Sequence, residues 1–257
     1  MTLGPVDPGH ALLLVGVGAV ASGLNAVAGG GSLVSFPTLN VVIGLQEKIA
    51  NATNSVGLWP GSLAGGLGFR NLLPKTSHYL KTLFLPTILG SICGAFLLLY
   101  TSNELFRKVV PGLILLASIL LFFQPRVRQF VLGNRTKISE AYGWGLQFLV
   151  AVYGGYFGAG MGIMMLAAFA LYMDGTIHEL NAVKNWLGLI INFAASVVFF
   201  AQGYVVLWPA VWILLGGLIG GFVAARVSQR FDSDKLRIVI AIYGFAMTGF
   251  FVWRALR

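Results

Sequence analysis

Long apolar runs, separated by short polar stretches, fill most of this chain. Several runs approach the ~20 residues with which an α-helix crosses ~30 Å of hydrocarbon. They lack the alternation over ~10-residue segments that a membrane β-barrel requires. We therefore predict an all-α polytopic membrane protein, with apolar segments at residues 11–28, 32–45, 50–69, 80–100, 108–123, 141–158, 161–173, 183–202, 206–225 and 236–254.

The composition excludes an ordinary soluble protein. Hydrophobic residues make up 57% of the chain and charged residues only 10%, with a mean hydropathy of +0.84. A soluble domain carries roughly 25% charged residues. The formal net charge of +9 comes from basic residues in short loops beside the apolar segments, so it indicates membrane orientation rather than nucleic-acid binding. The start of the chain lacks the basic stretch of a cleavable signal, which predicts that segment 11–28 stays in the membrane.

The orientation follows from the 17 lysines and arginines. Most of them fall on one face if segments 11–28 and 32–45 form a hairpin that enters and leaves on one side, as 141–158 and 161–173 would. They divide almost evenly if each pair forms one kinked span. The hairpin arrangement satisfies the positive-inside rule and places both termini outside the cytoplasm of an inner-membrane protein. Whether the hairpins re-enter or span fully stays open, because 32–45 covers only about 20 Å.

The two halves of the chain are similar to each other. Adding 131 to the residue number superposes Gly29 on Gly160, and other glycines of the first half on glycines of the second. Each half then has a glycine-broken hairpin followed by three transmembrane helices, so the two halves point in opposite directions. We predict two inverted repeats, residues 1–125 with an N-terminal tail and residues 141–257, joined by a basic cytoplasmic linker at 126–140.

The broken hairpins carry the motifs of a known family. The first half resembles the first repeat of the TauE/SafE sulfite exporter family, also called TSUP, in the runs AVAGGGSLVSFPTLNVVIGL and ANATNSVGLWPGSLAG. The second half resembles the second repeat in YGGYFGAGMGIMMLAAFALYMDG and NAVKNWLGLIINFAAS. One departure is Ala168, which stands where the first repeat has Pro37. The resemblance covers nearly the whole chain and implies a permease for sulfur-containing anions such as sulfite or organosulfonates, often an exporter.

An anion inside a membrane needs hydrogen-bond donors and a positive field. Glycine-rich breaks that open a helix supply both, because the first backbone N–H groups are unpaired and lie at the positive end of the helix dipole. The alternative is that these glycines only allow close helix packing. We predict that a small oxyanion binds between the two breaks, at Gly30, Gly31, Ser32, Gly160, Met161 and Gly162.

Polar side chains extend the predicted site. Asn192 lies near the middle of its apolar segment and Asn25 precedes the first break, so either amide could donate to an anion. An interhelical hydrogen bond is the alternative role for both. Asn54 and its repeat counterpart Asn185 are candidate gates, and Lys184 is the cation expected at a cytoplasmic vestibule.

Other chemistry is poorly represented in the sequence. The three histidines show no metal-ligand spacing, so we predict no metal and no cofactor. An integral-membrane enzyme is the least favoured reading, because no nucleophile and base stand on adjoining segments. All 8 acidic residues lie in loops or at segment ends, which favours voltage-driven export, with coupling through a protonated substrate still open. The remaining alternatives are an anion channel and an uptake permease for thiosulfate-like or sulfate-like anions, and the oligomeric state is undefined.

Overall fold

The computed structural model describes residues 7–27, 29–75, 77–133, 139–227 and 234–256, in which helices alternate with short connections and no strand occurs. A π-helical turn, η1 (Thr38–Val42), extends the second α-helix, and a 3₁₀ helix, η2 (Arg70–Lys75), follows the third. The α-helices are α1 (Pro8–Val27), α2 (Ser32–Pro37), α3 (Glu47–Gly68), α4 (Ser77–Tyr100), α5 (Asn103–Phe122), α6 (Gln124–Gly133), α7 (Glu140–Tyr156), α8 (Met161–Tyr172), α9 (Ile177–Ala201), α10 (Leu207–Val227) and α11 (Asp234–Ala255).

Six of these helices are long and apolar enough to cross a membrane: α1, α4, α5, α9, α10 and the part Arg237–Ala255 of α11. The prediction of an all-α polytopic membrane protein is therefore confirmed. Helix α3 has 22 residues, a comparable length, but its sequence is less apolar. Other helices bury most of its residues, and polar groups within a membrane bundle are tolerated on such protein-facing surfaces.

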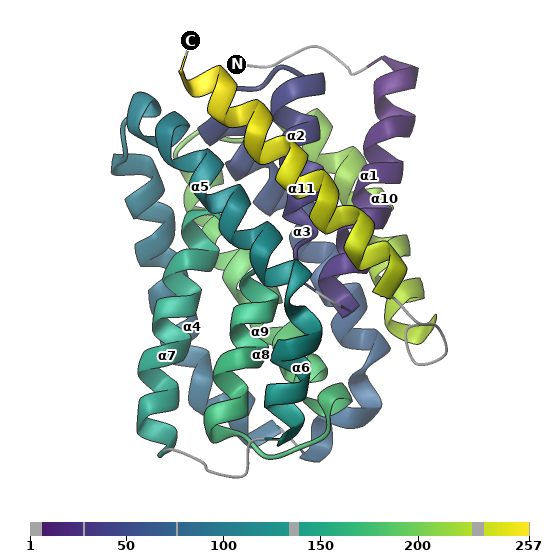
Figure 1. Ribbon diagram of the computed structural model, residues 1–257, viewed down its shortest axis with the longest axis vertical. Coiled ribbons are helices and arrows are strands. Elements are labelled where there is room, and N and C mark those ends of the chain that lie inside the picture. Colours follow the sequence, from purple (N-terminus) through teal and green to yellow (C-terminus); the bar gives the residue numbers. More distant parts are fainter. Residues whose placement is uncertain (1–6, 28, 76, 134–138, 228–233, 257) are drawn as a thin grey trace.

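Two helical hairpins enter the bundle from opposite ends (Figure 1). Helix α1 starts at the end of the molecule where α11 finishes, and α2 with η1 turns back toward that end. Helices α7 and α8 form the other hairpin, which comes in from the opposite end. The chain thus adopts hairpins that each enter and leave on one side. An inverted-repeat symmetry and the sidedness of the two ends stay predictions.

The first helix of each hairpin packs against a helix from the other half of the chain. A methyl group at Gly216 of α10 would lie only 1.9 Å from the carbonyl oxygen of Val15 on α1. A methyl group at Gly94 of α4 would lie 2.0 Å from the carbonyl oxygen of Val152 on α7. Small residues commonly let helix backbones approach this closely in lipid. These glycines, which lie outside the breaks, therefore serve helix packing.

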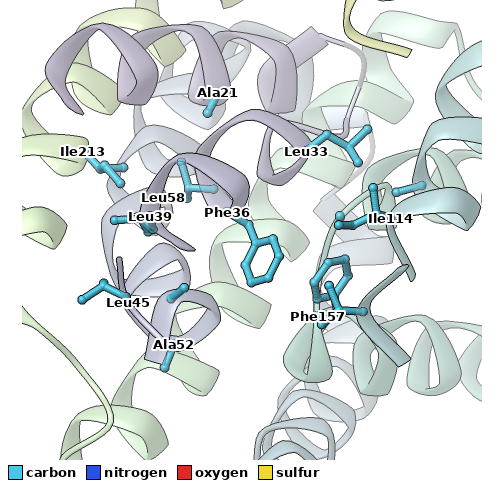
Figure 2. Packing of buried hydrophobic residues seen from close by; sticks show 14 of the residues in the cluster. Ala21, Leu33, Phe36, Leu39, Leu45, Ala52, Leu58, Ile114, Phe157 and Ile213 are labelled. Atoms are coloured by element: carbon cyan, nitrogen blue, oxygen red, sulfur yellow. The ribbon is translucent and has the colours of Figure 1, made fainter. Parts of the chain in front are cut away.

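The largest core cluster joins both hairpins to α5 and α11. Figure 2 shows Phe36 of α2 beside Phe157, which follows α7, with Ile114 of α5 close to them. The ring centroids of Phe36 and Phe157 are 5.3 Å apart in an edge-to-face arrangement, and Phe251 of α11 stacks on Phe36 at 5.8 Å. Each such pair contributes about 0.5–1.5 kcal/mol beyond the area that it buries. This packing fixes the first hairpin against the break of the second.

The segment predicted as a linker, 126–140, is partly helical. Its first residues belong to α6, and residues 134–138 lie outside the described part of the chain. Several basic residues of the predicted cytoplasmic face lie outside it as well, among them Arg135, Lys137 and Arg230. The division into two repeats and a linker therefore stays a prediction.

Candidate functional site

Each hairpin is broken by glycines whose backbone lies in the left-handed region. Between α1 and α2, Gly30 has a φ of 100°. Between α7 and α8, Gly160 has a φ of 77°. L-residues rarely adopt this conformation, whereas glycine does so at little cost. The glycines therefore end one helix and let the next one start in a new direction.

The two breaks are in contact with each other. A Cβ atom added at Gly29 would lie 3.1 Å from the backbone nitrogen of Ile163 and 3.2 Å from the Cα atom of Gly162. A Cβ atom added at Gly162 would in turn lie 3.2 Å from the Cα atom of Gly29. The backbone of the first break therefore touches the backbone at the start of α8 directly, with no side chain between them. The structure thus brings together the two glycine clusters that the sequence places far apart.

Several backbone amides of the two breaks donate to no protein acceptor within the described residues: those of Gly30, Ser32, Ala159, Gly160 and Gly162. N–H groups at the start of a helix are commonly unpaired, because no preceding helical turn supplies a carbonyl acceptor for them. Gly31 differs, because its N–H donates to the side-chain oxygen of Asn25 over 2.7 Å. The region therefore offers hydrogen-bond donors for a guest that carries acceptors only.

Asparagines hold the two breaks in place. The side-chain amide of Asn185 on α9 donates to the carbonyl oxygen of Ala26, near the end of α1, over 3.0 Å. The side-chain amide of Asn51 on α3 donates to the carbonyl oxygen of Tyr156, the last residue of α7, over 2.9 Å. Each hairpin is thus clamped by an asparagine from the other half of the chain. Asn51 was not predicted, although it stands one turn before Asn54 in the polar run ANATNS.

Lys184, the cation predicted at a cytoplasmic vestibule, lies at the contact between the two breaks. Its side chain is buried, with a relative exposure of 2%, and its Nζ donates to the carbonyl oxygen of Ala26 over 3.3 Å. Its Cδ atom lies 3.2 Å from the position that a Cβ of Gly162 would take. The vestibule prediction rested on a helix that began near residue 183. In the structure α9 begins at Ile177, which puts Lys184 about 10 Å along the helix.

The earlier start of α9 has a local cause. Thr176 and Glu179 form a capping box, in which the hydroxyl of Thr176 accepts from the backbone of Glu179 and the carboxylate of Glu179 accepts from the backbone of Thr176. This exchange satisfies backbone donors that the first turn would otherwise leave unpaired. The sequence T-x-x-E carried this signal ahead of the apolar run.

Asn54, a candidate gate, contacts a predicted binding residue. Its side-chain nitrogen lies 3.1 Å from the hydroxyl oxygen of Ser32, the first residue of α2, and donates to it. The side-chain oxygen of Asn54 is buried and accepts no hydrogen bond in the described part of the molecule. Asn54 therefore lies beside the first break, with hydrogen-bonding capacity left for a water or a guest.

The remaining predicted residues have distinct surroundings. Asn25 uses its side-chain oxygen to hold Gly31, so it organises the break. The side chain of Met161 is buried in an apolar cluster, and its methyl group lies 3.7 Å from where a Cβ of Gly188 would be. Asn192 is buried near the middle of α9, and no hydrogen bond to its side chain occurs among the described residues. The structure does not bring Asn192 into a contact with the breaks that would define its role.

A metal centre has no support within the described ranges, where histidine, cysteine, aspartate and glutamate never gather in groups of three or more. The arrangement instead combines backbone N–H groups, asparagine amides and one buried ammonium. Groups of these kinds can hold an oxyanion by hydrogen bonds and electrostatic attraction.

The chain is similar in sequence to several proteins named as membrane transporters. A protein of Haemophilus influenzae named "Probable membrane transporter protein" is 25% identical over 243 residues, which cover 94% of each chain. "Probable membrane transporter protein YfcA" of Escherichia coli K12 is 26% identical over 232 residues, 85% of this chain and 79% of that protein. A protein of Xylella fastidiosa, also named "Probable membrane transporter protein", is 24% identical over 251 residues, 93% of each chain. No solved structure matches significantly.

The family assignment rests on a match along nearly the full length. Residues 14–251 match the family described as "Sulfite exporter TauE/SafE". The matched range contains both glycine breaks and the helices that clamp them. The protein is accordingly a multi-pass membrane transporter of the TauE/SafE type and not an enzyme. The chain belongs to the TauE/SafE sulfite exporter family.

Proposed function

We propose that this permease exports a small sulfur-containing oxyanion, sulfite or an organosulfonate, through a site between the two glycine breaks. The observation that carries the proposal is the direct backbone contact between Gly29 and Gly162, which brings the unpaired amides of the two breaks close together. The two breaks would part to admit the anion between them. The family name supplies the substrate class.

The proposed site offers hydrogen-bond donors that replace the water molecules which the anion loses on entering the membrane. Helix α8 begins at Met161, so its unpaired amides and the positive end of its dipole, equivalent to roughly half an elementary charge, face the break. Backbone donors of this kind bind oxyanions at helix N-termini in many proteins. Ser32 and Asn54 add a hydroxyl and an amide at the first break, and Asn192 would add a second amide deeper in α9.

The charges favour export over proton-coupled uptake. Within the described residues, Glu179 is the buried carboxylate, and it caps the start of α9. A proton relay through the membrane usually needs a carboxylate farther inside. Each negative charge that leaves a cell with a negative interior gains about 2.3 kcal/mol per 100 mV. Voltage alone therefore suffices to drive an anion outward.

The proposal includes an orientation. The two hairpins would be related as inverted repeats of residues 1–125 and 141–257, in the inner cell membrane and with both termini outside the cytoplasm. The exchange of packing partners between the halves, with α1 against α10 and α7 against α4, supports this relation. In secondary transporters with this plan, the substrate binds near the midplane between broken helices.

The test is transport by the purified protein in proteoliposomes. Labelled sulfite, an alkylsulfonate, sulfate and thiosulfate would be followed in both directions under imposed voltage and pH gradients. We expect sulfite or the sulfonate to move outward from a negative interior, faster than in liposomes without protein. Saturable uptake of thiosulfate or sulfate would favour the uptake alternative, non-saturable flux would favour a channel, and flux equal to that of empty liposomes would refute anion transport.

A further inference from the structure

We propose that Lys184 supplies the positive charge that binds the transported anion, and that its ammonium group exchanges the carbonyl oxygen of Ala26 for the anion. The inference rests on the proposed function, because it concerns the same contact between the two breaks. It names a charged side chain as the main determinant of affinity, in addition to the backbone donors.

Lys184 is bonded less completely than the other buried lysine among the described residues. Lys48 on α3 donates to two carbonyl oxygens at the end of α4, those of Leu99 over 2.9 Å and Thr101 over 2.8 Å. Its ammonium also lies 5.2 Å from the ring centroid of Tyr204. Within the described part of the chain, Lys184 has one acceptor, the carbonyl oxygen of Ala26, at the longer distance of 3.3 Å. An ammonium has three donors, so Lys184 keeps two of them for a further partner.

Among the residues that the structure describes, no carboxylate compensates the charge of Lys184. The described residues contain no ion pair to this lysine, although its side chain is almost completely removed from solvent. A buried ammonium group is unfavourable unless it is paired and hydrogen-bonded. A bound oxyanion would supply both the opposite charge and the missing acceptors. This requirement distinguishes Lys184 from Lys48. The ammonium of Lys48 already donates to two carbonyl oxygens, and these lie at the negative end of a helix dipole.

The position of Lys184 matches that of the unpaired amides. Its hydrocarbon stem lies against Gly162, with Cδ at 3.2 Å and Cε at 3.8 Å from the position of an added Cβ. Gly162 belongs to the first turn of α8, and its own N–H has no protein acceptor in the described part of the chain. The ammonium and the helix start can thus approach one anion from two sides. Glycine at position 162 is what leaves room for the lysine stem.

Lys184 can leave Ala26 without exposing an unpaired carbonyl. The carbonyl oxygen of Ala26 also accepts a hydrogen bond from Asn185 over 3.0 Å. When the ammonium turns to the anion, Asn185 still satisfies this oxygen and still holds the end of α1. The exchange therefore leaves no buried acceptor without a donor at the end of α1.

The experiment compares Lys184→Gln and Lys184→Arg with the matched control Lys48→Gln. Sulfite binding would be measured by isothermal titration on each purified protein in lipid nanodiscs, and efflux would be measured in proteoliposomes. We expect Lys184→Gln to weaken sulfite binding on the order of 100-fold, as the loss of one partner of a buried charge pair does. Lys184→Arg, which keeps the charge, should lose about tenfold because its fork has another geometry. Lys48→Gln should lower the unfolding temperature without changing affinity.

The outcomes separate the two proposals. If the unaltered protein transports sulfite and Lys184→Gln binds it with unchanged affinity, Lys184 has only a structural role and the inference fails, while the proposed function stands. If the unaltered protein moves none of the anions, the proposed function fails, and the inference about Lys184 fails with it. Should Lys184→Gln not fold, Lys184→Met against Lys48→Met decides, because both remove the charge and an unchanged sulfite affinity in Lys184→Met would overturn the inference.

Discussion

A single methyl group at Gly162 tests whether the contact between the breaks matters for transport. In Gly162→Ala the new Cβ would lie 3.2 Å from the Cα atom of Gly29 and 3.2 Å from Cδ of Lys184. Ordinary van der Waals contact between carbon atoms is about 3.5–4.0 Å, so either the lysine stem or the opposing backbone must move. Overpacking of this kind typically costs 1–3 kcal/mol. Alanine regains up to about 1 kcal/mol of helix propensity, so the net loss of stability should be small.

The effect on anion binding should be larger than the effect on stability. If the overpacking by the new methyl group costs the anion-bound state 1–3 kcal/mol more than the free state, the affinity for the anion falls about 5- to 150-fold. The assay is titration of sulfite into the purified variant, with its thermal unfolding recorded in parallel. Gly188→Ala is the matched control on α9, because its new Cβ would meet the flexible ends of Met161 and Met165 at 3.7 and 3.8 Å. Unchanged sulfite affinity in Gly162→Ala would show that the contact between the breaks does not shape the anion site.

Three further predictions concern the other parts of the site and its orientation. Asn192→Leu should weaken sulfite binding more than it lowers the unfolding temperature, and a purified variant with unchanged affinity would remove Asn192 from the site. Asn51→Leu leaves the carbonyl oxygen of Tyr156 without its donor and should destabilise the protein by about 1–3 kcal/mol, measured by thermal unfolding in detergent; an unchanged transition would contradict the clamp. Single cysteines placed near Arg70 and Arg226 should react with a membrane-impermeant reagent from the same, cytoplasmic side, and labelling from opposite sides would reject the hairpin topology.

The sequence predicted the architecture well because apolar length and glycine breaks are local signals. The runs at 11–28 and 161–173 became α1 and α8 within a few residues, and the glycines between helices became the turning points of both hairpins. Hydropathy was less informative for α3, which lies inside the bundle and is less apolar than the helices that face lipid. Its length and its place in the repeat still identified it as a helix.

The site was only partly predictable, because its partners come from distant parts of the chain. The position of Lys184 depends on where α9 begins, and the capping box at Thr176 was the overlooked local signal. The role of Asn51 depends on a carbonyl group at Tyr156 in the other half, which no local pattern reveals. Asn25 was expected to donate to a substrate, and the sequence did not reveal that its side-chain oxygen accepts from the N–H of Gly31. Sequence patterns located the polar groups, and the tertiary packing decided which of them meet.

The most direct test of the account is a high-resolution structure of the protein in lipid nanodiscs with sulfite bound. We expect density for one oxyanion between the breaks, within about 2.7–3.2 Å of the amides of Gly160 and Gly162 and of Nζ of Lys184. In that structure the ammonium of Lys184 would no longer donate to the carbonyl oxygen of Ala26, which would accept from Asn185 alone. An anion bound elsewhere in the bundle, with the breaks still in closed contact and Lys184 still on Ala26, would contradict the account.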